Sequence, residues 1–243
     1  LRRQRQMCIR DRSFIPRLAA LLGTLLISAS LWAADIDAQT YGYPLTNPFE
    51  ATIATTPPEL RPKLPEDADI KQADYRVRLR PEREFQLPDN FWAVTKMSYR
   101  LAEQDGPAPL IFIIAGTGAH YSSGTPEYLK KLFYGAGYHV VQLSSPTSYD
   151  FMTSASRFAT PGISRDDAED MYRAMQAVRA QHPRLQVTDY YLTGYSLGAL
   201  HAAFVSQLDE TRRSFNFKRV LMLNPPVNLY TSITNLDLSL IHI

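Results

Sequence analysis

The sequence predicts an α/β fold, in which a mostly parallel sheet carries helices on both faces. Four short apolar runs show no alternation with polar residues, as expected for parallel strands that are buried on both faces. Segments with helical spacing lie between these runs, and two alternating segments precede them. Strands that alternate with helices in this way are typical of a parallel sheet covered on both sides.

The strands can be placed by residue. Tyr75, Val77 and Leu79 alternate with arginines, which is typical of a half-buried strand. Residues 91–101 are a second and less regular candidate, and the two segments together predict an antiparallel lead-in pair. The buried strands are expected at residues 110–115, 139–143, 189–193 and 219–223.

Three helices are expected between these strands. Thr125-Pro126-Glu127 combines a capping hydroxyl, a proline at the first helical position and an acid in the first turn. Ser164 and Asp167 resemble a capping box, and apolar residues recur after them at helical spacing. The third helix, at residues 197–208, is small and apolar in composition.

The composition fits one globular domain and excludes several functions. The chain has 243 residues, of which 45% are hydrophobic, enough for a substantial buried core. The net charge of +2 comes from six arginines in residues 1–17, and the remainder carries 20 basic and 23 acidic residues. It therefore offers no basic stripe for nucleic acid. Cys8 is the one cysteine, which excludes a disulfide framework and a cysteine metal site, and we expect no metal and no cofactor.

Residues 1–38 are predicted to be an N-terminal leader. The uncharged apolar run at 18–34 follows a basic stretch, as in a secretory signal peptide, with cleavage between Ser30 and Ala38. A membrane anchor is the alternative, because the run approaches the roughly 20 residues that span a bilayer. We therefore expect a periplasmic or secreted protein, which contacts a membrane only if the leader is retained. Residues 1–12 and 238–243 resemble translated sequencing-adapter sequence.

The remaining chain divides at residue 74. Residues 39–73 are rich in proline and polar residues and predict an extended lead-in, whereas residues 74–237 are expected to form the α/β domain. Within this domain, Gly194-Tyr195-Ser196-Leu197-Gly198 is a G-x-S-x-G motif that directly follows an apolar strand and opens a helix. That setting is the one in which the motif presents a nucleophilic serine on a tight turn. The alternative is that Ser196 only caps the helix.

With this motif in this context, residues 74–230 resemble the α/β-hydrolase superfamily, and most of all its exported bacterial members. The resemblance implies that Ser196 is the nucleophile and that the backbone N–H of Leu197 is one donor of the oxyanion hole. The second donor is expected from the loop after residues 110–115, at Thr117 or Gly118. The chain is then a serine hydrolase that cleaves an ester, thioester or amide of a small or lipid-like acyl substrate through an acyl-serine intermediate.

The resemblance places the catalytic acid and histidine after the nucleophile. After residue 223 the chain offers only Asp237 and His242, five residues apart with no strand between them, and we assign neither. Asp209 and Glu210 end the elbow helix and are expected to point away from the site. The α/β-hydrolase fold is therefore expected to be incomplete at its C-terminal side, and this fragment to be inactive. A non-catalytic hydrolase-fold binding protein and an acyltransferase that uses the same serine remain as alternatives.

The other histidines are expected to have supporting roles. His120 precedes the nucleophile, so we expect a substrate-side or exposed polar role rather than that of a general base. His201 is expected to pack on the elbow helix, and His139 and His182 to be structural. The loop at 144–157 either lines a substrate pocket or packs in the core. Its apolar residues are Tyr149, Phe151 and Met152.

Overall fold

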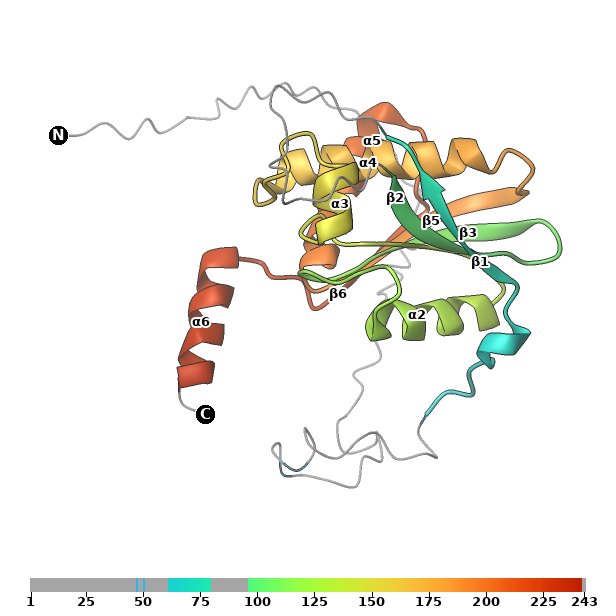
Figure 1. The fold of residues 1–243 in the computed structure, drawn as a ribbon. Helices are drawn as coiled ribbons and strands as arrows, with labels where there is room; N and C mark the ends of the chain where they lie inside the picture. Colours follow the sequence, from blue (N-terminus) through green and yellow to red (C-terminus); the bar gives the residue numbers. More distant parts are fainter. Residues whose placement is uncertain (1–46, 48–49, 51–60, 80–95, 242–243) are drawn as a thin grey trace, which may run out of the picture. The chain divides into compact units, whose positions relative to one another are not determined.

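The computed structural model describes residues 47, 50, 61–79 and 96–241, with side chains as far as Asn235 (Figure 1). The chain divides into two compact units, Leu1–Arg61 and Pro62–Ile243, and the fold described below is that of the second unit. The expected leader and the tail beyond residue 241 lie outside the described residues, as do residues 91–95 of the second strand candidate. The boundaries expected at residues 38, 73 and 237 stay predictions.

The second unit contains a six-stranded mixed sheet with the order β1-β2-β4-β3-β5-β6. β1 pairs antiparallel with β2 and β2 antiparallel with β4, whereas the pairs β3–β4, β3–β5 and β5–β6 are parallel. The predicted mostly parallel sheet and its antiparallel lead-in pair are thus confirmed. The strands are β1 Gln72–Val77, β2 Met97–Ala102, β3 Ala108–Ile114, β4 His139–Leu143, β5 Val187–Tyr195 and β6 Arg219–Leu223.

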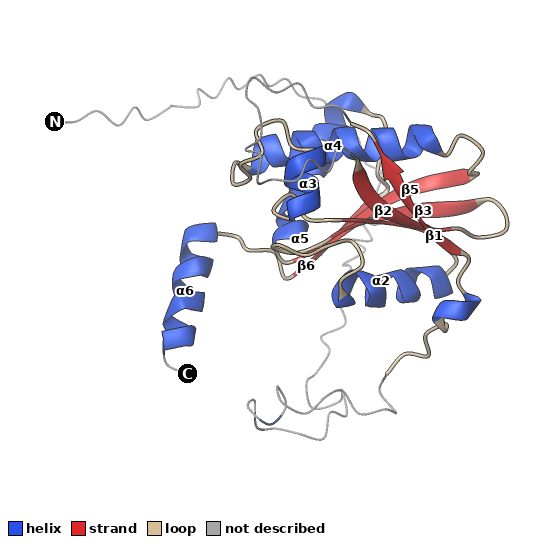
Figure 2. Ribbon diagram, in the orientation of Figure 1, coloured by secondary structure: helices blue, strands red, loops and turns tan. Residues whose placement is uncertain are grey.

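Helices cover both faces of this sheet, with α2 on one side and α3, α4 and α5 on the other (Figure 2). The alternate side chains of β3 show why its sequence does not alternate. Leu110, Phe112 and Ile114 belong to the core cluster that includes residues of α3, α4 and α5, while Ile111 and Ile113 pack in a second cluster with residues of α2. Each such fully buried side chain stabilises the fold by about 1.5–3 kcal/mol.

Five helices are described in this unit: three follow the expected positions, and α3 and α6 are additions. They are α2 Gly124–Gly135, α3 Tyr149–Ser154, α4 Ser164–Gln181, α5 Leu197–Arg212 and α6 Leu229–Ile241, and a short 3-10 turn covers Asp67–Asp69. α3 lies within the expected loop at 144–157. Its Phe151 is fully buried in the larger core cluster, which favours the core role for this residue, whereas Tyr149 is exposed.

Two predicted helix caps are wrong in detail. The first helix begins at Gly124, after an N-cap residue Ser123 whose side chain makes no capping hydrogen bond. The expected capping box of α4 does not form either, because Ile163 occupies the N-cap position. The Asp167 carboxylate instead accepts a hydrogen bond of 2.9 Å from the backbone N–H of Gly162. The Asp167 side chain therefore contacts the loop before α4 instead of capping the helix.

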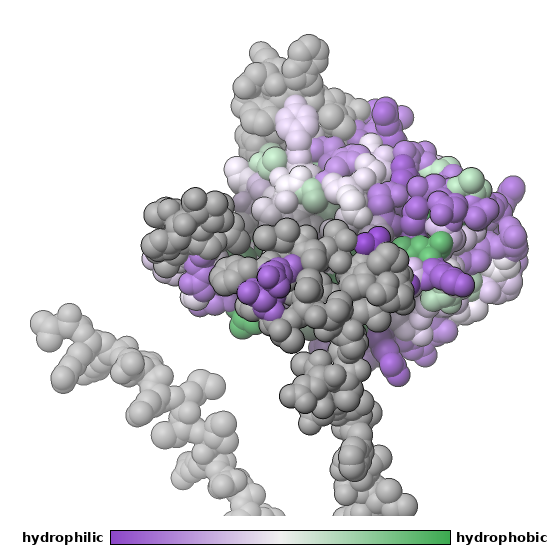
Figure 3. Space-filling view, turned by 90° about the horizontal axis from the view of Figure 1, so that it is seen from below, coloured by the Kyte–Doolittle hydropathy of each residue, from purple (hydrophilic) through white to green (hydrophobic). Residues whose placement is uncertain are grey.

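One face of this unit is largely polar where its residues are described. On the side seen from below the view of Figure 1, hydrophilic side chains cover much of the coloured surface, and hydrophobic ones form only small, separate areas (Figure 3). Among the described residues, no helix is both long enough and apolar enough to cross a membrane.

Candidate active site

The G-x-S-x-G motif forms a sharp turn between β5 and α5. Ser196 stands between the last residue of the strand and the first residue of the helix, with φ 54° and ψ −123°. A positive φ is rare for a residue with a side chain, and such conformations cluster at functional sites. The backbone N–H of Ser196 donates a hydrogen bond of 2.9 Å to the carbonyl oxygen of Leu223, which ties the turn to the end of β6.

Both glycines of the motif are required by close backbone contacts. A Cβ on Gly194 would lie 2.7 Å from the backbone nitrogen of Ala199, and a Cβ on Gly198 would lie 2.5 Å from the carbonyl oxygen of Ala115. Real Cβ atoms do not approach backbone atoms this closely. The two positions therefore admit only glycine if α5 is to pass this near to β3 and β5.

The loop after β3 lies directly against this turn. A Cβ on Gly116 would be 3.2 Å from the carbonyl oxygen of Tyr195 and 3.5 Å from the Cβ atom of Ser196. The N–H of Ala119 donates to the carbonyl oxygen of Gly116, and Gly118 has φ +66°. A four-residue turn with a glycine at positive φ in its third position is a type II turn. The structure thus brings the expected oxyanion loop and Ser196 together.

The two candidate donors in this loop differ in what they contact. The N–H of Gly118 donates a hydrogen bond of 2.7 Å to the hydroxyl of Thr147. In the described part of the chain, the N–H groups of Thr117 and Leu197 make no hydrogen bond. For Leu197 this follows from its place at the first position of α5, where no intrahelical acceptor exists. Thr117 and Leu197 are therefore free to bind a ligand's oxygen, whereas Gly118 is not.

Three residues after β4 with hydroxyl side chains, Ser144, Ser145 and Thr147, make hydrogen bonds that hold the loop after β3 in place. The sequence patterns did not predict this group. Tyr121 donates its backbone N–H to the hydroxyl of the buried Ser144 at 3.0 Å. The N–H of Ser145 donates to the carbonyl oxygen of Ala119, and the hydroxyls of Ser145 and Thr147 share a hydrogen bond of 2.8 Å. No local motif marks these residues, because the loop residues that they bind lie more than 20 positions away in the sequence.

His120 lies at this edge, in a polar setting. Its Nδ1 is 2.8 Å from the hydroxyl of Ser122, and its Nε2 is 3.8 Å from a carboxylate oxygen of Asp150. Its ring packs on the ring of Tyr121, whose pKa is raised, mainly by burial and further by the nearby carboxylate of Asp74. The side chain of His120 is 44% exposed, as expected for a polar residue beside the site.

The other described histidines lie at the other end of the strands or contact a neighbouring helix. His139 begins β4, and His182 lies between α4 and β5, so both are at the amino end of the parallel strands, whereas Ser196 follows a carboxyl end. His201 is buried on α5, where its Nε2 is 3.6 Å from a carboxylate oxygen of Asp167 on α4. These positions fit the structural roles expected for them.

Asp209 is buried at the end of α5 and organises the turn that leads to β6. Its carboxylate accepts hydrogen bonds from the Tyr172 hydroxyl at 2.6 Å and from the backbone N–H groups of Phe215 and Phe217 at 3.0 and 3.1 Å. This carboxylate therefore serves the fold at the end of the helix remote from Ser196, as expected. Residues 224–235, which follow β6, contain no acid and no histidine. The side chains of Asp237 and His242 lie outside the described part.

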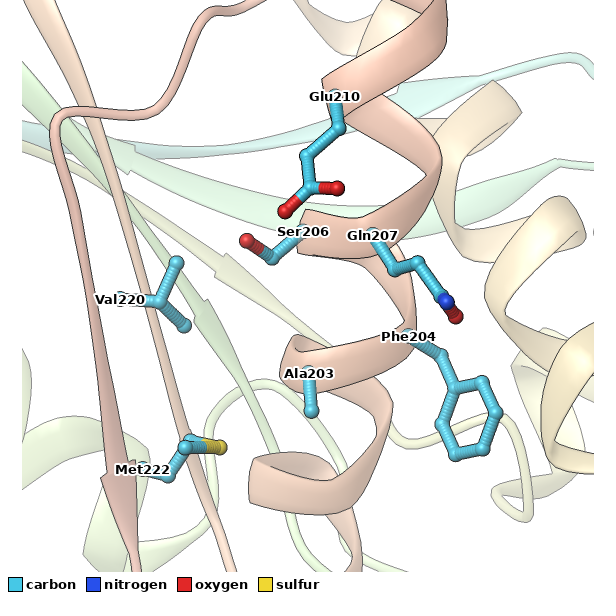
Figure 4. Close-up of a pocket in the computed structure, with 7 residues that line it drawn as sticks. All are labelled: Ala203, Phe204, Ser206, Gln207, Glu210, Val220 and Met222. Carbon is cyan, nitrogen blue, oxygen red and sulfur yellow. The ribbon is translucent and has the colours of Figure 1, made fainter. Parts of the chain in front are cut away.

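One surface depression lies between α5 and β6 (Figure 4). It has a volume of about 440 Å³, and its walls come from these two elements alone. It begins at Ala203, two helical turns beyond Ser196, so we do not assign it to the candidate site. Its lining residues are Ala203, Phe204, Ser206, Gln207, Glu210, Val220 and Met222. Within the described residues, no cluster of His, Cys, Asp and Glu side chains could hold a metal ion.

Several solved structures resemble this chain in fold. An esterase from Pyrococcus furiosus has a TM-score of 0.53 at 12% identity, over 73% of this chain and 57% of its own. A dienelactone hydrolase from Anabaena variabilis (TM-score 0.43, 16% identity, 64% of each chain) and Est1E from Butyrivibrio proteoclasticus (0.39, 19%, 54% of this chain and 47% of its own) are less similar in structure. No protein-family model and no curated protein matches the sequence.

The six-stranded sheet, its helices and this likeness show that the chain has the α/β-hydrolase fold. The chain spans between 47% and 64% of the length of the first three structures that it resembles.

Proposed function

We propose that this chain carries the nucleophile and the oxyanion hole of a serine hydrolase that acts on an acyl substrate. The observation that supports this most is the strained backbone of Ser196, held between two glycines and against the loop after β3. Backbone strain of this kind costs about 1–3 kcal/mol, and a serine that only capped a helix would have no need of it. The names of the structural neighbours, which include esterases, agree with a hydrolase.

In this mechanism the Oγ atom of Ser196 attacks the carbonyl carbon of an ester, thioester or amide. Its proton passes to a base, and the carbonyl oxygen becomes an oxyanion that accepts hydrogen bonds from the N–H groups of Leu197 and Thr117. The C–O, C–S or C–N bond then breaks, the leaving group takes up the proton, and water releases the acid from the acyl-serine. Gly118 is not a donor in this proposal, because its N–H is bound to Thr147.

We assign no described residue as the base. His139 and His182 lie at the opposite end of the strands from Ser196, and His201 contacts Asp167 on α4. His120 is expected to contact the substrate or solvent. The proposal includes export from the cytoplasm, with membrane contact only through a retained leader, and binding of a small-molecule or lipid-like acyl compound. Both parts rest on the sequence.

A fluorophosphonate probe tests the proposal, because it phosphonylates an activated serine with loss of fluoride. We expect the protein, expressed within its complete reading frame, to form one adduct at Ser196, located by mass spectrometry of its peptides. Ser196→Ala should abolish the adduct, whereas Ser206→Ala, a change on the same helix away from the turn, should leave it intact. A folded protein that forms no adduct at Ser196 would refute the proposed function.

A further inference from the structure

The loop that supplies the proposed oxyanion donor is fixed by contacts with the segment after β4. Two hydrogen bonds join the loop to residues 145–147, one from the Gly118 N–H to the Thr147 hydroxyl at 2.7 Å and one from the Ser145 N–H to the Ala119 carbonyl oxygen at 3.0 Å. The second bond uses the backbone only. The first depends on a side chain, and so on the amino acid at position 147.

We propose that Thr147 is a positioning residue for the oxyanion hole. Its hydroxyl accepts the N–H of Gly118 and thereby holds the turn over Gly116–Ala119 in one conformation, with the N–H of Thr117 left free. This inference rests on the proposed function, because it gives the turn a role in binding the substrate oxygen. It adds a residue that lies 49 positions before Ser196 in the sequence.

The physical argument begins with the glycine. Gly118 tolerates positive and negative φ about equally, so the central peptide of the turn can rotate unless another contact holds it. The Thr147 hydroxyl provides that contact, since it accepts the N–H that such a rotation would turn away.

The Thr147 hydroxyl is itself held in place. It shares a hydrogen bond of 2.8 Å with the Ser145 hydroxyl, whose oxygen also accepts the backbone N–H of Thr147 at 3.2 Å. Ser145 is fully buried, so the acceptor for Gly118 is presented from a rigid base. Preorganised donors of this kind stabilise a developing oxyanion without any reorganisation during the reaction.

The test compares Thr147→Val with Thr147→Ser in the protein expressed within its complete reading frame. Valine keeps the shape of the side chain but removes the acceptor, while serine keeps the acceptor. Thr153→Val is the matched control, because the Thr153 hydroxyl donates to the carbonyl oxygens of Tyr149 and Asp150 within α3. All variants are measured for the hydrogen exchange of the Gly118 amide, for the rate of phosphonylation of Ser196, and for kcat and KM with a p-nitrophenyl ester.

In Thr147→Val we expect hydrogen exchange of the Gly118 amide to be at least about tenfold faster, because the variant loses one ordinary hydrogen bond to this amide. Phosphonylation and kcat should fall by about 10- to 100-fold, below the full loss of an oxyanion donor, with KM changed by less than about threefold. Thr147→Ser and Thr153→Val should both behave as the unmodified protein.

Unchanged exchange of the Gly118 amide in Thr147→Val would overturn the proposal, as would a Thr147→Ser variant as slow as Thr147→Val. If the unmodified protein forms no adduct, the proposed function fails and with it the role of Thr147 in catalysis. The exchange measurement would then still decide whether Thr147 anchors the turn, so the two failures can be told apart.

Discussion

At the scale of single residues, the backbone of Ser196 is held in a strained conformation. Its φ of 54° is unfavourable for serine, and the hydrogen bond from its N–H to the carbonyl oxygen of Leu223 helps to hold it there. The two glycines of the motif allow the surrounding backbones to come close enough to enforce this conformation. Packing between β3, β5 and α5 thus offsets the free-energy cost of the strained backbone at Ser196.

The glycine positions give a direct prediction. In Gly198→Ala the new methyl group would meet the backbone of β3, and we expect a loss of about 3 kcal/mol or more in the free energy of unfolding, together with loss of the Ser196 adduct. Gly106→Ala is the control, because nothing lies within 4 Å of the added Cβ, and it should change stability by less than about 1 kcal/mol. Urea denaturation measures both. Equal stability of the two variants would contradict the close contact at Gly198.

The motif at this site could be predicted from the sequence, and its supporting residues could not. Gly194, Ser196 and Gly198 are adjacent in a pattern whose chemistry is local. Thr147 and Ser145 gain their roles only from a loop that precedes them by almost 30 positions, and serines and threonines after a strand have many ordinary uses.

At the scale of elements, capping was the least predictable feature. Ser164 and Asp167 have the spacing of a capping box, yet the Asp167 carboxylate contacts Gly162 and lies near His201 instead. A carboxylate in the first turn of a helix can serve any nearby donor, and the neighbouring helix and loop decide which one. Asp209 similarly ends α5 but organises the residues that follow it.

His139 links β4 by hydrogen bonds to Gln104 and to Gln186, which precedes β5. Its Nδ1 accepts the N–H of Gln104 at 3.0 Å, and its Nε2 donates to the carbonyl oxygen of Gln186 at 3.1 Å, which requires the neutral ring. Burial lowers the pKa of His139 below its ordinary value, and the same cause lowers the pKa of His182. The unfolded chain therefore binds these protons at a higher pH than the folded chain does.

We expect the free energy of unfolding to be constant above a pH of about 6.5, as far as these histidines determine it, and to fall as the pH drops from there to the lowered pKa values. His139→Gln can keep both hydrogen bonds without titrating, so its stability should fall less steeply over this range. Urea denaturation at a series of pH values measures the slopes. A slope as steep in His139→Gln as in the unmodified protein would contradict the role given to His139.

At the scale of the whole unit, the sheet ends in an edge that is more exposed than a parallel strand usually is. β6 pairs only with β5 among the described strands, and its Leu221 and Met222 are 47% and 46% exposed. Parallel strands normally lie between other elements, and an exposed apolar edge favours pairing with another chain. The depression in Figure 4 lies along this same edge.

This edge predicts self-association of the 243-residue chain. Leu221→Lys should lower the association constant by about tenfold or more. A charged side chain on an edge strand opposes pairing with another chain, and the burial of the leucine side chain on association is lost. Tyr128→Lys changes a residue on α2 that is also 47% exposed, and it should leave association unchanged. Sedimentation velocity over a range of concentrations measures both. A monomer at every concentration, or equal effects of the two variants, would contradict the prediction.

The sequence by itself determined the order of the strands and of α2, α4 and α5, the two-sided burial of β3 and the position of the serine turn. These features follow from local periodicity and from a motif of five adjacent residues. The tertiary structure alone decided that Thr117 rather than Gly118 has a free N–H, that Phe151 is a core residue and that Asp167 does not cap its helix. The physical reason is that a hydrogen bond or a packing contact depends on which distant segments the sheet brings together. Patterns of neighbouring residues in the sequence therefore do not predict these contacts.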